Sequence, residues 1–191
     1  ILAGTDMNSH SSVHVADVEG DGDLELTVSG ASFAAGRILV LEVDGYGNVT
    51  RKASVVYGRI EAAATSTVHP QQTHVYATLT ETGVKNVDGE AEWYRAGVQY
   101  EQSTWELTGM ATTGLWTVET LRAAIVGIAE TPYETPVTTR AKRLVEHKRQ
   151  LFRSETSSDA HAYLDLGDLG EHALPYETYQ LAFTPNFVDQ V

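Results

Sequence analysis

The chain has 191 residues, of which 42% are hydrophobic, and a net charge of -13. This length suits one domain or somewhat more, and the hydrophobic share is enough to bury a core. The absence of cysteine excludes disulfides, thiolate zinc sites and cysteine nucleophiles. Acidic residues outnumber basic ones by 26 to 13, which disfavours nucleic-acid binding. No apolar run approaches the ~18 residues of a membrane-spanning helix, so we expect no membrane insertion.

Residues 1–36 form an acidic segment that we treat as a separate unit. In SVHVADVEGDGDLELTVSG, apolar residues alternate on both sides of an acidic glycine turn. This pattern predicts a strand, a turn and a second strand. The small residues of GASFAAG, Gly30–Gly36, then predict a connector.

The acidic turn is the one metal-like motif in the sequence. Its alternating acids are Asp17, Glu19, Asp21, Asp23 and Glu25. Hard carboxylate oxygens around a tight glycine turn are the ligands that Ca²⁺ prefers. The motif resembles the FG-GAP and VCBS-type loops of propeller blades, although the full EF-hand loop is absent. A solvated acidic turn, in which Asp side chains bond their own backbone, explains the same pattern. The cofactor prediction is therefore either Ca²⁺ or none.

A hairpin is predicted next, with strands over Ile38–Val43 and Val49–Tyr57. The joining loop, Asp44–Asn48, contains two glycines and an asparagine, which tolerate positive φ. The alternating run Thr73–Thr80 predicts another strand. A longer strand, rich in aromatic residues, is predicted to end at Gly109. We interpret its aromatic side chains as packing residues and not as a carbohydrate platform.

One helix of about three turns is predicted after this strand. Thr117 can cap its N-terminus. The apolar residues that follow at helical spacing are Val118, Leu121, Ile125 and Ile128. Thr131–Thr139 contains two prolines and is predicted to be an extended linker.

The segment AKRLVEHKRQLFR fits a helix and a strand about equally well, and periodicity leaves both open. It lies in a basic cluster made of Arg140, Lys142, Arg143, Lys148, Arg149 and Arg153. We interpret this cluster as a solvated or salt-bridged sheet face and not as a phosphate site. The final run YETYQLAFT alternates, with Tyr179, Leu181 and Phe183 on one face, and predicts a last strand.

No catalytic constellation is evident in the sequence. The seven histidines lack metal-binding spacing and are predicted to be structural; they are His10, His14, His69, His74, His147, His161 and His172. A nucleophile-elbow serine and phosphate-cradling glycine patterns are absent, and Glu90 and Glu92 resemble solvated surface more than a glycosidase pair. We therefore expect no enzyme.

Five phrases in order resemble one family, the B component of the bacterial insecticidal toxin complexes, or Tc toxins, which is related to Rhs and YD-repeat proteins. The phrases are LEVDGYGNVTRKASVVYGR, WYRAGVQYEQSTWELTG, WTVETLRAA, KRLVEHKRQLFR and ALPYETYQLAFTP. They span roughly Arg37–Val191, so residues 37–191 are interpreted as one β-rich shell segment. The resemblance does not extend to residues 1–36.

The resemblance implies a mainly β fold, in which antiparallel hairpins form part of a larger β-sheet shell that follows a propeller. The basic segment would be a strand, and the helix a minor decoration. The function implied is non-catalytic encapsulation of a toxic effector. The partners would be the C component with its enclosed effector, and the pore-forming A component through the propeller of the full-length protein. The chain would be bacterial and secreted or released as part of this virulence complex. The alternative is a calcium-binding, VCBS- or FG-GAP-like propeller or adhesion module.

Overall fold

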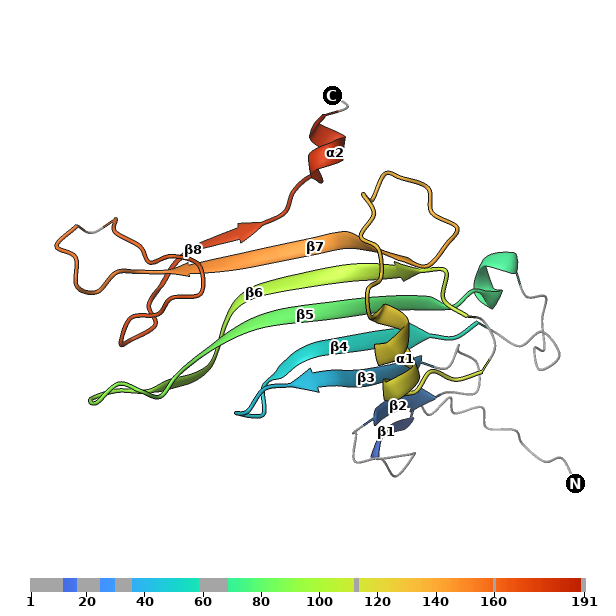
Figure 1. Ribbon diagram of the computed structural model, residues 1–191, viewed down its shortest axis with the longest axis horizontal. Coiled ribbons are helices and arrows are strands. Elements are labelled where there is room, and N and C mark those ends of the chain that lie inside the picture. Colours follow the sequence, from blue (N-terminus) through green and yellow to red (C-terminus); the bar gives the residue numbers. More distant parts are fainter. Residues whose placement is uncertain are drawn as a thin grey trace, which may run out of the picture.

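The computed structural model describes residues 36–58, 69–111, 114–159 and 161–189, and the backbone alone of residues 12–16 and 25–29. Its eight strands form one antiparallel sheet, in which each strand pairs with its neighbours in the sequence (Figure 1). The strands are β1 (Ser12–Ala16), β2 (Glu25–Ser29), β3 (Gly36–Val43), β4 (Val49–Val56), β5 (Tyr76–Val87), β6 (Arg95–Thr108), β7 (Ala141–Phe152) and β8 (Pro175–Gln180). The helices are η2 (Pro70–Thr73), α1 (Val118–Ile125) and α2 (Pro185–Val188). The predicted mainly β fold with one short helix is confirmed.

The core lies between one face of the sheet and α1, which crosses this face over β3 and β4 (Figure 1). A row of paired residues crosses four strands, namely Leu39, Ala53, Leu79 and Trp105. Val118 and Leu121 of α1 are fully buried in the same cluster. The expectation that the helix is a minor decoration is therefore wrong, because α1 supplies the apolar layer that the sheet face needs.

The bounds of α1 follow from its two ends. Thr117 caps the N-terminus, since the Thr120 N–H donates to the Thr117 hydroxyl over 3.1 Å. Gly127 ends the helix with a φ of 65°. The helix therefore has 8 residues and is shorter than the three turns predicted. Ile128 lies beyond it and still packs partly buried against the core.

The basic segment, which fits a helix or a strand, forms strand β7. Its pairing with β6 shifts by one residue between the pairs Glu146–Thr104 and Leu144–Trp105, so Val145 is an extra residue. The apolar residues Leu144 and Val145 are adjacent in the sequence, and the bulge falls at this pair. Two adjacent apolar residues then imitate the spacing of a helical stripe.

Strand β8 is shorter than predicted. It ends at Gln180, so Leu181 and Phe183 lie beyond the strand, and of the three predicted face residues only Tyr179 is within it. The first two strands agree with the pattern predicted for residues 1–36, since β1 pairs antiparallel with β2. The predicted hairpin of β3 and β4 is also confirmed, although in its loop Gly47 has a positive φ, 87°, and Asn48 does not.

The β3–β4 turn is tied to the β5–β6 hairpin through the Asp44 carboxylate. This carboxylate accepts hydrogen bonds from the backbone N–H groups of Tyr46 and Asn48, each over 2.9 Å, and from the Asn86 amide over 2.7 Å. Asn86 in turn accepts from the Gly97 N–H over 2.8 Å. The hydrogen bonds from Asn48, first its side chain and then its backbone, lower the pKa of Asp44 to about 2. This network joins two hairpins that are separate in the sequence.

The Asp44 network predicts a specific acid response. Because the pKa of Asp44 is lowered, its stabilising contribution is present above the ordinary value of 3.8 and is lost as pH falls through about 2. Titration of the Asp44 carboxyl by NMR should show a midpoint near 2, and Asn86→Ala should move it upward. The exposed Asp165 is the control, since Asp165→Asn should leave the Asp44 midpoint unchanged. A midpoint near 3.8 in the unmodified chain would refute the network.

The buried position of α1 predicts the effect of truncating its central side chain. Leu121→Ala should lower the free energy of unfolding by about 2 to 5 kcal/mol, because it leaves a cavity between the helix and the sheet. Leu115→Ala, at a position with 59% exposure just before the helix, is the matched control and should change it little. Denaturant unfolding followed by circular dichroism measures both. Equal effects of the two substitutions would mean that α1 does not form part of the core.

Candidate functional site

Three features of the described residues bear on function: a charged face of the sheet, a groove at one tip of the molecule, and the outer edge of β8. The charged face continues the apolar face beyond α1. Arg51 Nη2 lies 3.2 Å from Glu81, and Lys142 Nζ lies 3.8 Å from the same carboxylate and 3.9 Å from the centre of the Trp105 ring. The change from apolar to charged residues therefore occurs along the strands themselves.

A second group of charges lies on the same face, where Glu101 of β6 bridges two residues of β7. Its Oε1 is 2.7 Å from His147 Nε2 and 2.8 Å from Arg149 Nε. Partial burial raises the pKa of Glu101, but the hydrogen bonds from Arg149 and His147 outweigh burial and lower it. Glu101 and His147, together with Arg51 and Glu81, line an open groove of about 420 Å³.

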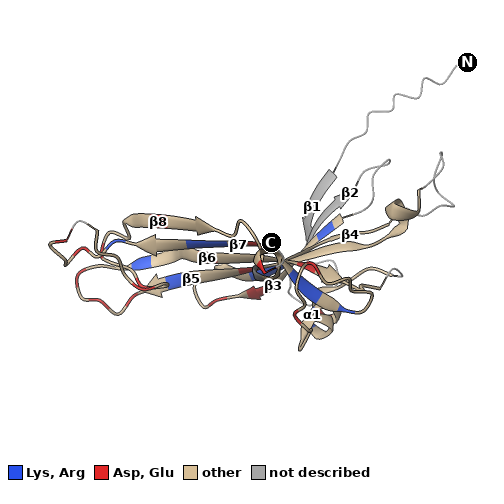
Figure 2. Cartoon of the chain, turned by 90° about the horizontal axis from the view of Figure 1, so that it is seen from above, with Lys and Arg blue, Asp and Glu red and all other residues tan. Residues whose placement is uncertain are grey.

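These contacts also account for the basic cluster of the sequence. Four of its six members have a carboxylate partner within 4 Å, and the Lys and Arg positions are coloured blue along β5, β6 and β7 in Figure 2. The four are Lys142, Arg143, Lys148 and Arg149. The interpretation of this segment as a salt-bridged sheet face is confirmed for these residues. Three of these pairs join different strands, whereas Lys148 and Glu146 both belong to β7.

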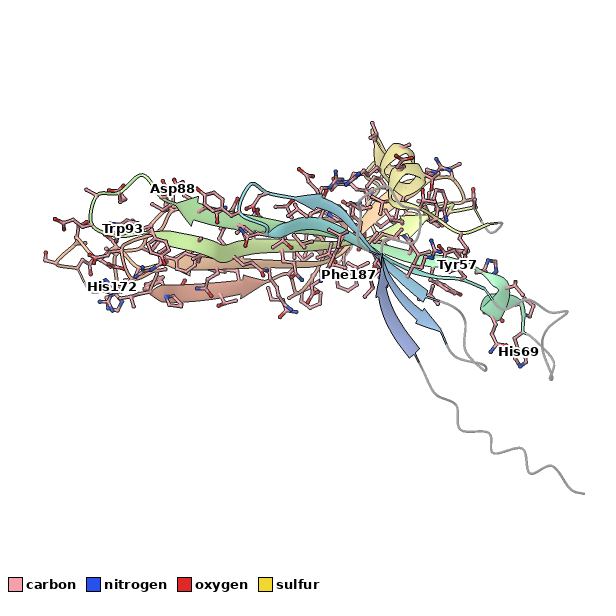
Figure 3. All side chains as sticks on the ribbon, turned by 90° about the horizontal axis from the view of Figure 1, so that it is seen from below. Tyr57, His69, Asp88, Trp93, His172 and Phe187 are labelled. Carbon is pink, nitrogen blue, oxygen red and sulfur yellow. The ribbon has the colours of Figure 1, made fainter. Side chains whose placement is uncertain are left out.

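The groove at the tip is formed by two loops that are far apart in the sequence. One is the β5–β6 loop, which contributes Trp93, and the other is the long β7–β8 loop, which contributes the remaining lining residues. Trp93 and His172 lie at the same end of the molecule in Figure 3. The Lys85 Nζ of β5 lies 3.4 Å from Asp168 of the long loop. The groove encloses about 710 Å³.

Glu155 and His172 line the tip groove and contact each other. The His172 N–H donates to Glu155 Oε1 over 2.9 Å, and His172 Nδ1 lies 2.9 Å from Glu155 Oε2. The Glu155 side chain is only 17% exposed. A Cβ at Gly170 would lie 2.7 Å from Glu155 Oε1, so a larger residue there would displace the end of the Glu155 side chain.

Each member of this pair shifts the pKa of the other. The hydrogen bond that the His172 ring donates to the Glu155 carboxylate, and the charge of that carboxylate, raise the pKa of His172 above 6.5. Burial raises the pKa of Glu155, but the hydrogen bonds from His172 outweigh it, and the net pKa lies below 4.5. The stabilising contribution of the pair is therefore fully present between 4.5 and 6.5. It is lost as pH falls through the pKa of Glu155 or rises through that of His172.

The outer edge of β8 ends the sheet among the described residues. The Leu181 N–H donates to the His147 carbonyl of β7 over 2.8 Å. Backbone groups alternate along an antiparallel strand, so those of Gln180 and Thr178 point away from β7. Aromatic pairs lie in β8 and in the segments on either side of it: the exposed Tyr163 ring stacks on the half-buried Tyr176 ring at 5.5 Å, and the exposed Phe183 and Phe187 rings stack at 5.4 Å.

The structure does not describe the side chains of the predicted calcium ligands. Asp17, Glu19, Asp21 and Asp23 fall outside the described residues, and Glu25 begins β2 with only its backbone described. The calcium site therefore stays a prediction. Sequence reasoning missed the grouping of Glu155, Glu171 and His172, whose potential ligand atoms lie within 4.8 Å of one another. Their only local signal is the adjacency of Glu171 and His172, because Glu155 comes from the opposite end of the loop.

No protein-family model matches the chain, and a search of curated proteins finds no match either. Within the described residues, no helix combines the length and apolar character that crossing a bilayer requires.

Proposed function

We propose that the chain is a structural, non-catalytic segment of a toxin-encapsulating β-shell of the kind found in the B component of Tc toxins. The observation that carries the proposal is the outer edge of β8, where the backbone groups of Thr178 and Gln180 point away from the sheet. Such groups pair readily with another strand. The sequence resemblance supplies the kind of assembly in which the pairing would occur.

The pattern of burial supports a wall element over a self-contained domain. Among the described residues, apolar packing covers only the part of the sheet beneath α1, and β5, β6 and β7 continue past it as charged strands. Adjacent strands satisfy each other's backbone groups, so a sheet can extend sideways as long as every new strand is paired. A wall built in this way encloses a volume without needing a thick core.

Encapsulation is the mechanism that such a wall would serve. In the proposal, neighbouring segments of the B component and the C component continue the sheet and separate the effector from its surroundings. The propeller of the full-length protein would contact the pore-forming A component. The assembled complex would be a bacterial virulence factor that is secreted or released. The ion pairs of Arg51, Lys142 and Glu101 support this role, because they fix strand positions on a face where apolar packing ends.

The open edge predicts concentration-dependent self-association of the isolated chain. Gln180→Pro removes one N–H group that points outward from β8, and it leaves the pairing with β7 intact. This substitution should reduce self-association, as measured by sedimentation velocity over a concentration series. Gln180→Ala is the matched control, since it removes the same side chain but keeps the N–H, and it should behave as the unmodified chain does.

The same experiment can reject the proposal. A monodisperse monomer of the unmodified chain that unfolds cooperatively at all concentrations would contradict an edge that pairs with other strands. Co-expression with the neighbouring shell segments of a B component and with a C component should suppress self-association. Persistent aggregation in their presence would also count against the shell.

A further inference from the structure

We propose that Glu155, Glu171 and His172 bind a divalent transition-metal ion of the zinc class at the tip groove. The inference is independent of the proposed shell function and rests on the β7–β8 loop alone. Glu155 lies near the start of this loop, and Glu171 and His172 lie near its end. A metal ion held by both parts would clamp the loop closed.

The distances suit a shared ion. Each of the three residues offers one potential ligand atom, and these atoms all lie within 4.8 Å of one another. His172 Nδ1 and Glu155 Oε2 are already 2.9 Å apart. Zinc–nitrogen and zinc–oxygen bonds are about 2.0 to 2.2 Å long, which places neighbouring ligand atoms roughly 3 Å apart. Small side-chain rotations of the exposed Glu171 would complete the set.

The imidazole of His172 decides which ion is favoured. Clusters of carboxylates alone select hard ions such as Ca²⁺ and Mg²⁺, whereas imidazole nitrogen suits zinc and its neighbours. His172 also lies against the carboxylate that would share the ion, since its Nδ1 is 2.9 Å from Glu155 Oε2. A metal ion there would replace the Nδ1 proton, and binding should strengthen as pH rises through the pKa of His172.

The surroundings hold Glu155 in place and leave room for further ligands. Glu155 is fixed by the His172 N–H and by its close approach to Gly170, so little rearrangement is needed on binding. The groove of about 710 Å³ leaves space for water to fill the remaining coordination positions. The charges that face His172 are those of Glu155 and Glu171, which favour a cation, and that of Arg95, which opposes one more weakly.

The test is calorimetric titration of the chain with Zn²⁺ at neutral pH, followed by the same titration of three variants. His172→Asn and Glu171→Gln remove a ligand each and should weaken binding at least tenfold. His161→Asn is the matched control, since His161 is an exposed histidine of the same loop, and it should bind as the unmodified chain does. Melting curves without metal check that all three variants fold.

A spectroscopic readout locates the ion. With Co²⁺ in place of Zn²⁺, NMR signals of His172 and Gly170 should broaden most strongly, and Ca²⁺ should not compete efficiently. Binding that survives both His172→Asn and Glu171→Gln would assign the ion to other residues and overturn the proposal. Absence of Zn²⁺ binding by the unmodified chain would overturn it as well, and would leave Glu155 and His172 as an ion pair only.

Discussion

The described structure depends on the burial of one sheet face beneath α1. A single-layer sheet cannot cover its own apolar face, so the row from Leu39 to Trp105 needs a second layer, and α1 supplies it through Val118 and Leu121. This layer covers only part of the sheet. Beyond α1, no second apolar layer covers the strands among the described residues. Backbone pairing, ion pairs and turns stabilise the strands there.

Because the core is limited, the polar contacts between strands are concentrated in the part of the sheet that lies beyond it. The Asp44 network joins the β3–β4 turn to the β5–β6 hairpin at a point beyond the apolar rows. The Glu101 bridge joins β6 to β7 in the same region. Each contact fixes the position of one strand relative to the next. Among the described residues, strand-to-strand pairing stops at β8, whose inner side pairs with β7 and whose outer side has no partner strand.

Sequence patterns predicted the elements whose signals are local. The glycine-rich loop after Val43 defined a hairpin, and Thr117 with its apolar residues at helical spacing defined α1. Strand β7 could not be distinguished from a helix, because its apolar residues do not alternate and Val145 is an extra residue opposite β6. A bulge of this kind is determined by the partner strand, which periodicity within one segment does not contain.

The residues that meet in the tip groove could not be predicted from the sequence for a different physical reason. Glu155 and His172 meet because the β7–β8 loop closes on itself, and no residue spacing within the loop encodes that closure. The role of α1 was misjudged for a related reason, since its amphipathic pattern predicts a helix but not how much of the core it supplies. The predicted calcium ligands and the shell assembly stay predictions.

Amide hydrogen exchange tests the central claim, that the outer edge of β8 is built to pair with another strand. In a dilute solution of the monomeric chain, the backbone amides of Thr178 and Gln180 should exchange rapidly. The Leu181 amide, which donates a hydrogen bond to β7, should be protected. All three should be protected once the chain is assembled. Slow exchange of Thr178 and Gln180 in the dispersed chain, equal to that of Leu181, would mean that this edge is already covered and would contradict the account.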